Sequence, residues 1–90
     1  MEFVKRLSTS EAKYKYLGLT KHAREEFPPK DQIFKLKFKN KTYDFKVNNK
    51  DCIMFSQLYH VYQFVEGDEV RITKNKDGSF ELSVNYQRNM

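Results

Sequence analysis

The 90-residue chain is long enough for one small domain, and its eight Phe and six Tyr supply most of the large side chains for a core. A single cysteine, Cys52, excludes an intramolecular disulfide, and the sequence lacks a run of about 20 apolar residues that would span a bilayer. The net charge is +5, with thirteen Lys/Arg against six Asp/Glu in residues 1–50 and four against six in residues 51–90. A basic half favours a polyanionic partner such as nucleic acid, although an ordinary solubilising surface has the same composition.

Residues 1–90 are expected to form one domain, with residues 87–90 as a frayed tail. The first ten residues, "MEFVKRLSTS", lack the apolar run of a signal peptide. We therefore expect a cytoplasmic, nucleoid-associated protein, or a nuclear one if the source is eukaryotic. No membrane partner is expected, and the sequence leaves open a larger protein or a second copy of the chain.

The first third of the chain predicts two strands, a basic arm and a short helix. Residues 2–7, "EFVKRL", are strand-like, and residues 8–16, "STSEAKYKY", have no apolar period, which predicts an exposed loop or arm. A second strand is expected at residues 16–19. Thr20 then caps a predicted helix over residues 21–27, which the two following prolines end.

The middle of the chain has the clearest β-hairpin pattern. In "IFKLKFKNKTYDFKV", residues 33–47, apolar and polar side chains alternate on both sides of a turn predicted at Asn40–Lys41. This period of two predicts a pair of half-buried strands. A polar loop, residues 48–51, and a short strand follow.

The pattern then changes to that of a helix. Apolar residues recur at i, i+3, i+4 and i+7, which predicts a helix that faces the core with Phe55, Leu58, Tyr59 and Tyr62. Ser56 is its candidate N-cap. After the segment "FVEGDEVRI", a last hairpin is expected, with a turn at residues 75–78 and a strand over residues 80–86.

Three acids in "FVEGDEVRI" are candidates either for chemistry or for a structural turn. Alternation sends the side chains of Asp68 and Val70 to one face and that of Glu69 to the other, so Glu66, Asp68 and Glu69 do not converge. Gly67 is suited to a turn with positive φ, and the Asp68 carboxylate can accept turn N–H groups. The structural interpretation is the stronger one.

No catalytic residue, metal ligand or cofactor is predicted. His22, His60 and Cys52 fall in no metal-binding spacing, and they lack the convergent groups that a catalytic site needs. The three glycines are scattered, so no glycine-rich phosphate loop is present. The sequence therefore favours a protein that is not an enzyme.

The order of the elements predicts a mainly β (α+β) domain. A mostly antiparallel, barrel-like sheet with two short helices at its ends accommodates the alternating strands. Curling the sheet into a barrel also limits the exposed strand edges.

Three segments, in order, resemble the B3-type DNA-binding domain. They are residues 7–28 ("LSTSEAKYKYLGLTKHAREEFP"), residues 41–47 ("KTYDFKV") and residues 56–72 ("SQLYHVYQFVEGDEVRI"). The resemblance covers about residues 4–74 and is nearest to prokaryotic members, which are related to recognition domains of restriction enzymes and to swapped-hairpin and RIFT barrels. It implies a seven-stranded open pseudobarrel with two short helices at its ends.

The resemblance also implies that two loops grip the major groove of double-stranded DNA. They correspond to Ser8–Tyr16, the first arm, and Asn48–Cys52, the second arm. The side chains in and beside these arms suit phosphate and base contacts. The candidate DNA-binding residues are Arg6, Ser8, Ser10, Lys13, Tyr14, Lys15, Tyr16, Asn48, Asn49 and Lys50.

Other functions remain open at this point. A small-molecule or nucleotide-binding RIFT-like barrel would need a concave pocket among the aromatics. A protein-interaction module would need a large exposed apolar patch. RNA binding would need exposed rings for base stacking, for which Tyr14 and Tyr16 are the candidates.

Overall fold

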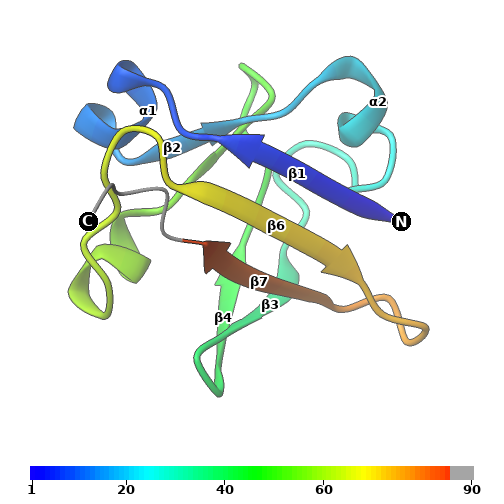
Figure 1. The fold of residues 1–90 in the computed structure, drawn as a ribbon. Coiled ribbons are helices and arrows are strands. Elements are labelled where there is room, and N and C mark those ends of the chain that lie inside the picture. Colours follow the sequence, from blue (N-terminus) through cyan, green and yellow to red (C-terminus); the bar gives the residue numbers. More distant parts are fainter. Residues whose placement is uncertain (86–90) are drawn as a thin grey trace.

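The computed structural model describes residues 1–85, which form two β-sheets wrapped around one core (Figure 1). The elements in chain order are β1 (Glu2–Arg6), α1 (Thr9–Tyr14), β2 (Tyr16–Gly18), α2 (Lys21–Arg24), β3 (Phe34–Phe38), β4 (Lys41–Phe45), β5 (Cys52–Met54), the 3₁₀ helix η1 (Ser56–His60), β6 (Glu69–Lys74) and β7 (Phe80–Asn85). The prediction of a mainly β, open pseudobarrel with seven strands and two short helices is confirmed over this part of the chain. The last residue of the final predicted strand, Tyr86, and the predicted frayed tail lie outside the described residues.

The larger sheet has the strand order β1-β6-β7-β3-β4, and the smaller sheet is the two-stranded ribbon β2–β5. All the strand pairs in these sheets are antiparallel except β3–β7. An isolated bridge from Val47 to Ile53 joins the segment after β4 to the ribbon. The barrel is open, because β1 and β2 belong to different sheets. At that opening the Lys5 ammonium donates to the Gly18 carbonyl oxygen at 3.0 Å.

Aromatic side chains fill the core, as the composition predicts. All eight phenylalanines are buried, and the rings of seven contact one another in two groups. In one, Phe27 stacks on Phe80 at 4.6 Å between ring centroids; in the other, Phe38 and Phe55 lie 5.7 and 6.0 Å from Phe64. Rings bury a large area each, which lets a small barrel exclude water.

The hairpin of β3 and β4 follows its predicted alternation, but its turn lies one residue earlier than predicted. Phe38 pairs with Lys41, so the two central turn residues are Lys39 and Asn40 rather than Asn40 and Lys41. Both have positive φ, 50° and 68°. Two consecutive residues of positive φ are typical of the type I′ turn, whose twist matches that of the flanking strands.

Three further local predictions are corrected. The predicted loop at residues 8–16 contains the helix α1, and α2 ends at Arg24 before i→i+3 turns that reach Phe27. The predicted helix after β5 is a 3₁₀ helix, and Ser56 is its first residue rather than its cap. Its two buried anchors, Phe55 and Leu58, are three residues apart, which is the repeat of a 3₁₀ helix.

The turn before β6 is built as predicted around Gly67 and Asp68. Gly67 has a φ of 90°, and Asp68 is fully buried. The Asp68 carboxylate accepts a hydrogen bond from the Val65 N–H at 3.0 Å and one from the Tyr62 hydroxyl at 3.3 Å. The Gly67 N–H donates to the Leu7 carbonyl oxygen and the Leu7 N–H donates to the Asp68 carbonyl oxygen, which ties the turn to the end of β1. The acid therefore stabilises the scaffold.

Replacing Asp68 with alanine is expected to lower the free energy of unfolding by about 3 kcal/mol, because buried donors lose their acceptor. Urea denaturation measures this change. The exposed neighbour Glu66 provides the control, since Glu66→Ala should alter stability by less than about 0.5 kcal/mol. Equal stability of the two variants would contradict a structural role for Asp68.

Among the described residues, no helix has the length and apolar character needed to cross a membrane.

Candidate nucleic-acid interface

The ribbon β2–β5 brings the two predicted arms together at one edge of the barrel. Its register pairs Tyr16 with Met54, Leu17 with Ile53 and Gly18 with Cys52. In Figure 1, α1 and the loop at residues 48–51 both project from the top edge. Segments more than 30 residues apart in the sequence thus form one surface.

Main-chain hydrogen bonds extend the ribbon at both ends. The Phe55 N–H donates to the Lys15 carbonyl oxygen at 2.7 Å, and the Leu19 N–H donates to the Asp51 carbonyl oxygen at 2.9 Å. Each arm is therefore fixed to the strand that carries the other. Such fixed geometry lowers the conformational entropy that the arms would lose on binding a partner.

The first arm is a short helix held by a capping box. The Ser8 hydroxyl accepts from the Glu11 N–H at 3.2 Å, and the Glu11 carboxylate accepts from the Ser8 N–H at 2.9 Å. This reciprocal pair satisfies two amides that a helix start leaves without partners. The spacing Ser-x-x-Glu in "STSE" is the sequence signal that identifies this helix, and a search for apolar periodicity alone misses it.

Glu11 also ties the arm to the barrel, and it is the main residue that sequence reasoning missed. Its side chain is buried, and it accepts from the Gly18 N–H at 2.8 Å and from the Lys5 ammonium at 2.7 Å. Burial by itself raises the pKa of this carboxyl. The hydrogen bonds from Lys5, Ser8 and Gly18 outweigh that effect and hold the pKa below its ordinary value of 4.5.

The outer surface of the first arm presents cations and rings to solvent. Lys13, Tyr14 and Lys15 are exposed, and the Lys13 ammonium lies 5.3 Å from the centroid of the Tyr14 ring. Lys15 ends the helix with a φ of 59°, and its ammonium lies 5.5 Å from the centre of the Tyr59 ring. These contacts hold positive charge at the surface of the arm.

The second arm is an Asx-type turn closed by Asn48. The Asn48 Oδ1 accepts from the N–H groups of Lys50 and Cys52, at 2.9 and 3.0 Å. The side-chain oxygen of Asn48 is thus used within the loop, which leaves the side-chain N–H₂ group available to donate to a partner. Asn49 and Lys50 are both exposed, and neither side chain is hydrogen-bonded to another described residue.

A depression of about 410 Å³ lies between the arms. It is lined by Tyr16, Asn48, Asn49, Lys50, Cys52 and Met54. Four of these are predicted binding residues, whereas Cys52 and Met54 were not singled out as contacts. Only the register of β2 with β5 shows that Met54 belongs to this surface, because it lies directly opposite Tyr16.

The Cys52 thiol in this depression is neutral near pH 7. Burial raises its pKa above the ordinary value of 9.0, and the nearby Glu11 carboxylate adds to the effect. Its Sγ donates weakly to the Lys50 carbonyl oxygen at 3.4 Å. The residue therefore contributes a small, largely apolar surface.

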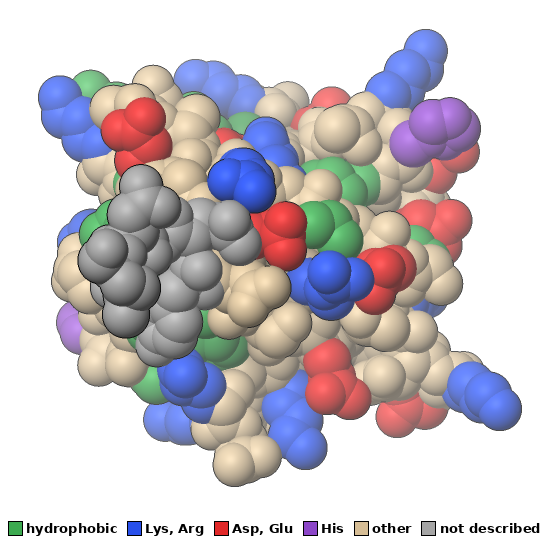
Figure 2. All heavy atoms as spheres, viewed as in Figure 1, with side chains coloured by type: hydrophobic (Ala, Val, Ile, Leu, Met, Phe, Trp, Pro, Cys, Tyr) green, Lys and Arg blue, Asp and Glu red, His purple; other side chains and the backbone are tan. Residues whose placement is uncertain are grey.

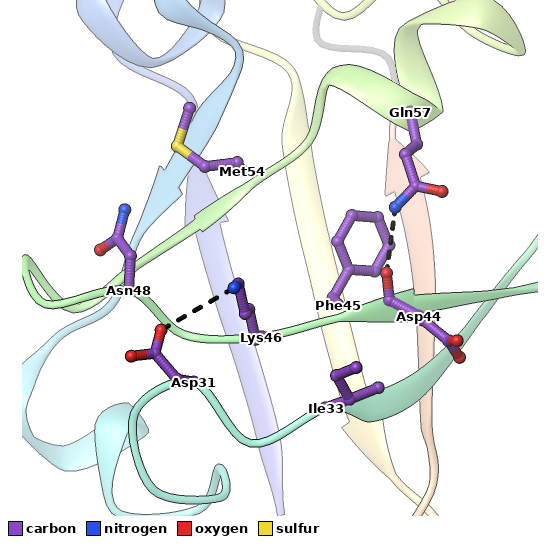
Figure 3. Close-up of a pocket in the computed structure, with 8 residues that line it drawn as sticks. All are labelled: Asp31, Ile33, Asp44, Phe45, Lys46, Asn48, Met54 and Gln57. Atoms are coloured by element: carbon purple, nitrogen blue, oxygen red, sulfur yellow. Dashed lines mark hydrogen bonds and ion pairs between the residues drawn. The ribbon is translucent and has the colours of Figure 1, made fainter.

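A second depression, of about 320 Å³, adjoins the first and is shown in Figure 3. Asn48 and Met54 line both. Its carboxylates are matched by cations: Asp31 lies 4.0 Å from the Lys46 ammonium, and Asp44 pairs with Lys35. The Gln57 amide donates to the backbone carbonyl oxygen of Asp44 at 3.0 Å. This is the concave feature that the small-molecule alternative would use.

The charge of the barrel differs from that of the arms. Figure 2 shows Lys/Arg and Asp/Glu side chains interspersed over β1, β6 and β7. Arg71, for example, lies 2.7 Å from Glu2 and 3.9 Å from Glu69. Neutralised pairs of this kind solubilise a surface without attracting a polyanion.

The structure places nine of the ten predicted site residues on the two arms. Arg6 lies apart, at the end of β1 opposite Glu69. Tyr16 and Asn48 are half-buried, and the other eight are exposed. Contact of these residues with a nucleic acid stays a prediction.

Comparison with known proteins finds likeness in structure but not in sequence. No protein-family model matches the chain, and no curated protein matches it. Among solved structures, a hypothetical Arabidopsis thaliana protein, At1g16640.1, has a TM-score of 0.69 at 16% identity, covering 100% of this chain and 93% of that one. The N-terminal domain of Helicobacter pylori LlaJI.R1 has a TM-score of 0.76 at 8% identity, covering 97% and 88%. Arabidopsis FUS3, solved as a complex with DNA, has a TM-score of 0.71 at 16% identity, covering 93% and 95%.

The chain has the B3-type pseudobarrel fold. The matches extend over nearly its full length, so all its described elements belong to that fold. The resemblance noted in three segments of the sequence is confirmed at the level of structure. At such low identity the B3-type fold fixes the position of the arms but does not say what they contact.

Within residues 1–85, no three His, Cys, Asp or Glu side chains lie close enough together to hold a metal ion. His22 and His60 are both exposed, on separate elements.

Proposed function

We propose that this protein binds double-stranded DNA without catalysing a reaction, by placing its two arms in the major groove. The observation that carries the proposal is the pairing of β2 with β5, which holds two polar, cation-bearing arms at the two ends of one ribbon on a B3-type barrel. A solved structure of the same fold, that of FUS3, is a DNA complex. The charge excess of residues 1–50 supports the same partner.

The chemistry of the arms divides their expected roles. Lys13, Lys15 and Lys50 end in flexible ammonium groups that suit phosphates, whose contacts supply affinity without sequence information. Asn49 carries a free amide that can donate to and accept from a base edge. Arg6, at the end of β1, suits either a phosphate or a guanine.

Fluorescence anisotropy with a labelled random-sequence duplex tests the proposal. We expect binding at low salt that weakens as salt increases, with the logarithm of affinity linear in the logarithm of salt concentration. Absence of binding at high micromolar protein in low salt would contradict it. A single-stranded RNA of equal length is the comparison, because stronger binding to RNA would favour the stacking alternative instead.

Asn49→Ala is expected to reduce discrimination between a preferred and a scrambled duplex by at least about fivefold, since a lost bidentate base contact costs about 1–3 kcal/mol. Affinity for the scrambled duplex should change less than twofold. Asn85→Ala, at an exposed residue at the end of β7, is the matched control. Equal weakening on both duplexes would assign Asn49 to the phosphate backbone.

A second candidate function uses the depression in Figure 3, where Ile33, Phe45 and Met54 provide apolar contact. Its volume is near the lower end of those that hold small ligands. Thermal stabilisation by a nucleotide or metabolite, in the absence of any binding to duplex DNA, would favour this function.

A further inference from the structure

The ribbon β2–β5 has one face in the core and one face between the arms. Leu17 and Ile53 are fully buried on the inner face. Side chains alternate along a strand, so the outer face carries Tyr16, Gly18, Cys52 and Met54. None of these four is an acidic or basic residue, although the Lys5–Glu11 ion pair abuts Gly18. The first arm beside them exposes Lys13 and Lys15, and the second exposes Lys50 next to Asp51, whose carboxylate pairs with Arg24.

Met54 is the residue on this face whose side chain is exposed to solvent rather than packed in the core. It is 45% exposed, whereas its neighbours Ile53 and Phe55 are 0% and 1% exposed. It lies opposite Tyr16 and, together with Asn48, lines both depressions. A flexible, polarizable thioether at such a place is suited to an irregular apolar contact with a partner.

The width of the ribbon and the cations that flank it indicate which partner this surface fits. A two-stranded ribbon is narrow enough to enter the major groove of B-DNA. Cations of the two arms, Lys13 and Lys15 on one side and Lys50 on the other, complement the phosphates that border the groove. Between the phosphates, the apolar group that the groove exposes is the C5-methyl of thymine.

We propose that Met54, supported by Tyr16, contacts the C5-methyl group of a thymine and so contributes sequence preference to the DNA binding proposed above. This inference rests on that proposed function and deepens it. The preferred site is then expected to contain a thymine at the centre of the footprint, between the positions set by the two arms.

The test removes only the methyl group. A preferred duplex is selected from a random pool with the full 90-residue chain, and each thymine is then replaced singly by deoxyuridine, which keeps base pairing unchanged. Anisotropy should show about fourfold weaker binding at one or two thymines, which corresponds to about 0.8 kcal/mol for one buried methyl-sized group. The other thymines should show no change.

Variants of Met54 assign the effect to this side chain. Met54→Ala should bind the thymine duplex about as weakly as the wild type binds the deoxyuridine duplex, and should lose the difference between them. Met54→Leu, which keeps an apolar side chain of similar volume, should retain most of the difference, and Met54→Gln should lose it. Val61→Ala, at a residue 47% exposed beyond η1, is the control and should keep the full difference. Thermal unfolding verifies that each variant is folded.

Three results would overturn the inference while leaving DNA binding intact: a selected site without thymine, no thymine sensitive to deoxyuridine, or a deoxyuridine effect that persists in Met54→Ala. Failure of every duplex to bind would instead overturn the proposed function and this inference together.

Discussion

Glu11→Ala is expected to lower the free energy of unfolding by about 3 kcal/mol, because a partly buried ion pair is lost and the backbone N–H groups of Ser8 and Gly18 lose their acceptor. Lys5 keeps its bond to the Gly18 carbonyl oxygen, so it is not left without any partner. Chemical denaturation followed by circular dichroism measures the change. Because Glu11 joins α1 to β2, we also expect weaker DNA binding under conditions in which the variant is folded.

Two other variants control for this effect. Glu11→Gln keeps the shape but not the charge, and should cost about half as much, since one carbonyl oxygen can still accept from a backbone N–H. Glu25→Ala removes an exposed acid and should change stability by less than about 0.5 kcal/mol. If Glu11→Ala were as stable as Glu25→Ala, the hydrogen bonds of Glu11 would contribute nothing to the fold.

Glu11 should also make the stability of the folded protein depend on pH. The pKa of Glu11 is lowered in the folded protein, so between that lowered pKa and the ordinary value of 4.5 the unfolded chain binds more protons than the folded one. The stabilisation is therefore complete above about pH 4.5 and is lost as the pH falls through the folded-state pKa. The stability difference between wild type and Glu11→Gln should shrink in that window. A difference that stays constant with pH would contradict the assignment.

The double variant Lys13→Ala with Lys15→Ala is expected to weaken binding to all duplexes by roughly tenfold at low salt. It should also reduce the salt slope by about 2, because two phosphate contacts with their released counterions are removed. Anisotropy titrations over a series of salt concentrations measure both quantities. Since phosphate contacts carry no sequence information, the ratio of the affinities for the preferred and the scrambled duplex should stay unchanged.

A control of equal charge change lies away from the arms. Lys37 on β3 and Lys76 in the β6–β7 turn are exposed, and in Figure 1 their elements lie away from α1. Changing both to alanine should weaken binding less than about threefold, through long-range attraction alone. If the two double variants were indistinguishable, binding would depend on net charge rather than on the first arm.

The sequence predicts most of the barrel because its signals are local. Alternation in β3, β4, β6 and β7 reflects a sheet with one buried face, and the phenylalanines of that pattern form the core. The turn at Gly67 and Asp68 is likewise local, since a positive φ and an acceptor for nearby N–H groups are properties of a few adjacent residues. Errors of one or two residues occur where a type I′ turn or a 3₁₀ repeat sets the boundary.

The candidate site is predicted less completely, because it depends on contacts between distant segments. The first arm lacks an apolar face, and its helix is held by Glu11, whose partners Lys5 and Gly18 come from two different strands. Met54 enters the surface through its register with Tyr16, a pairing that spans 38 positions. The sequence by itself determined a basic, phenylalanine-rich B3-like barrel and the composition of its arms. Only the tertiary structure decided which side chains share a surface, because strand pairing and burial join residues that no local pattern relates.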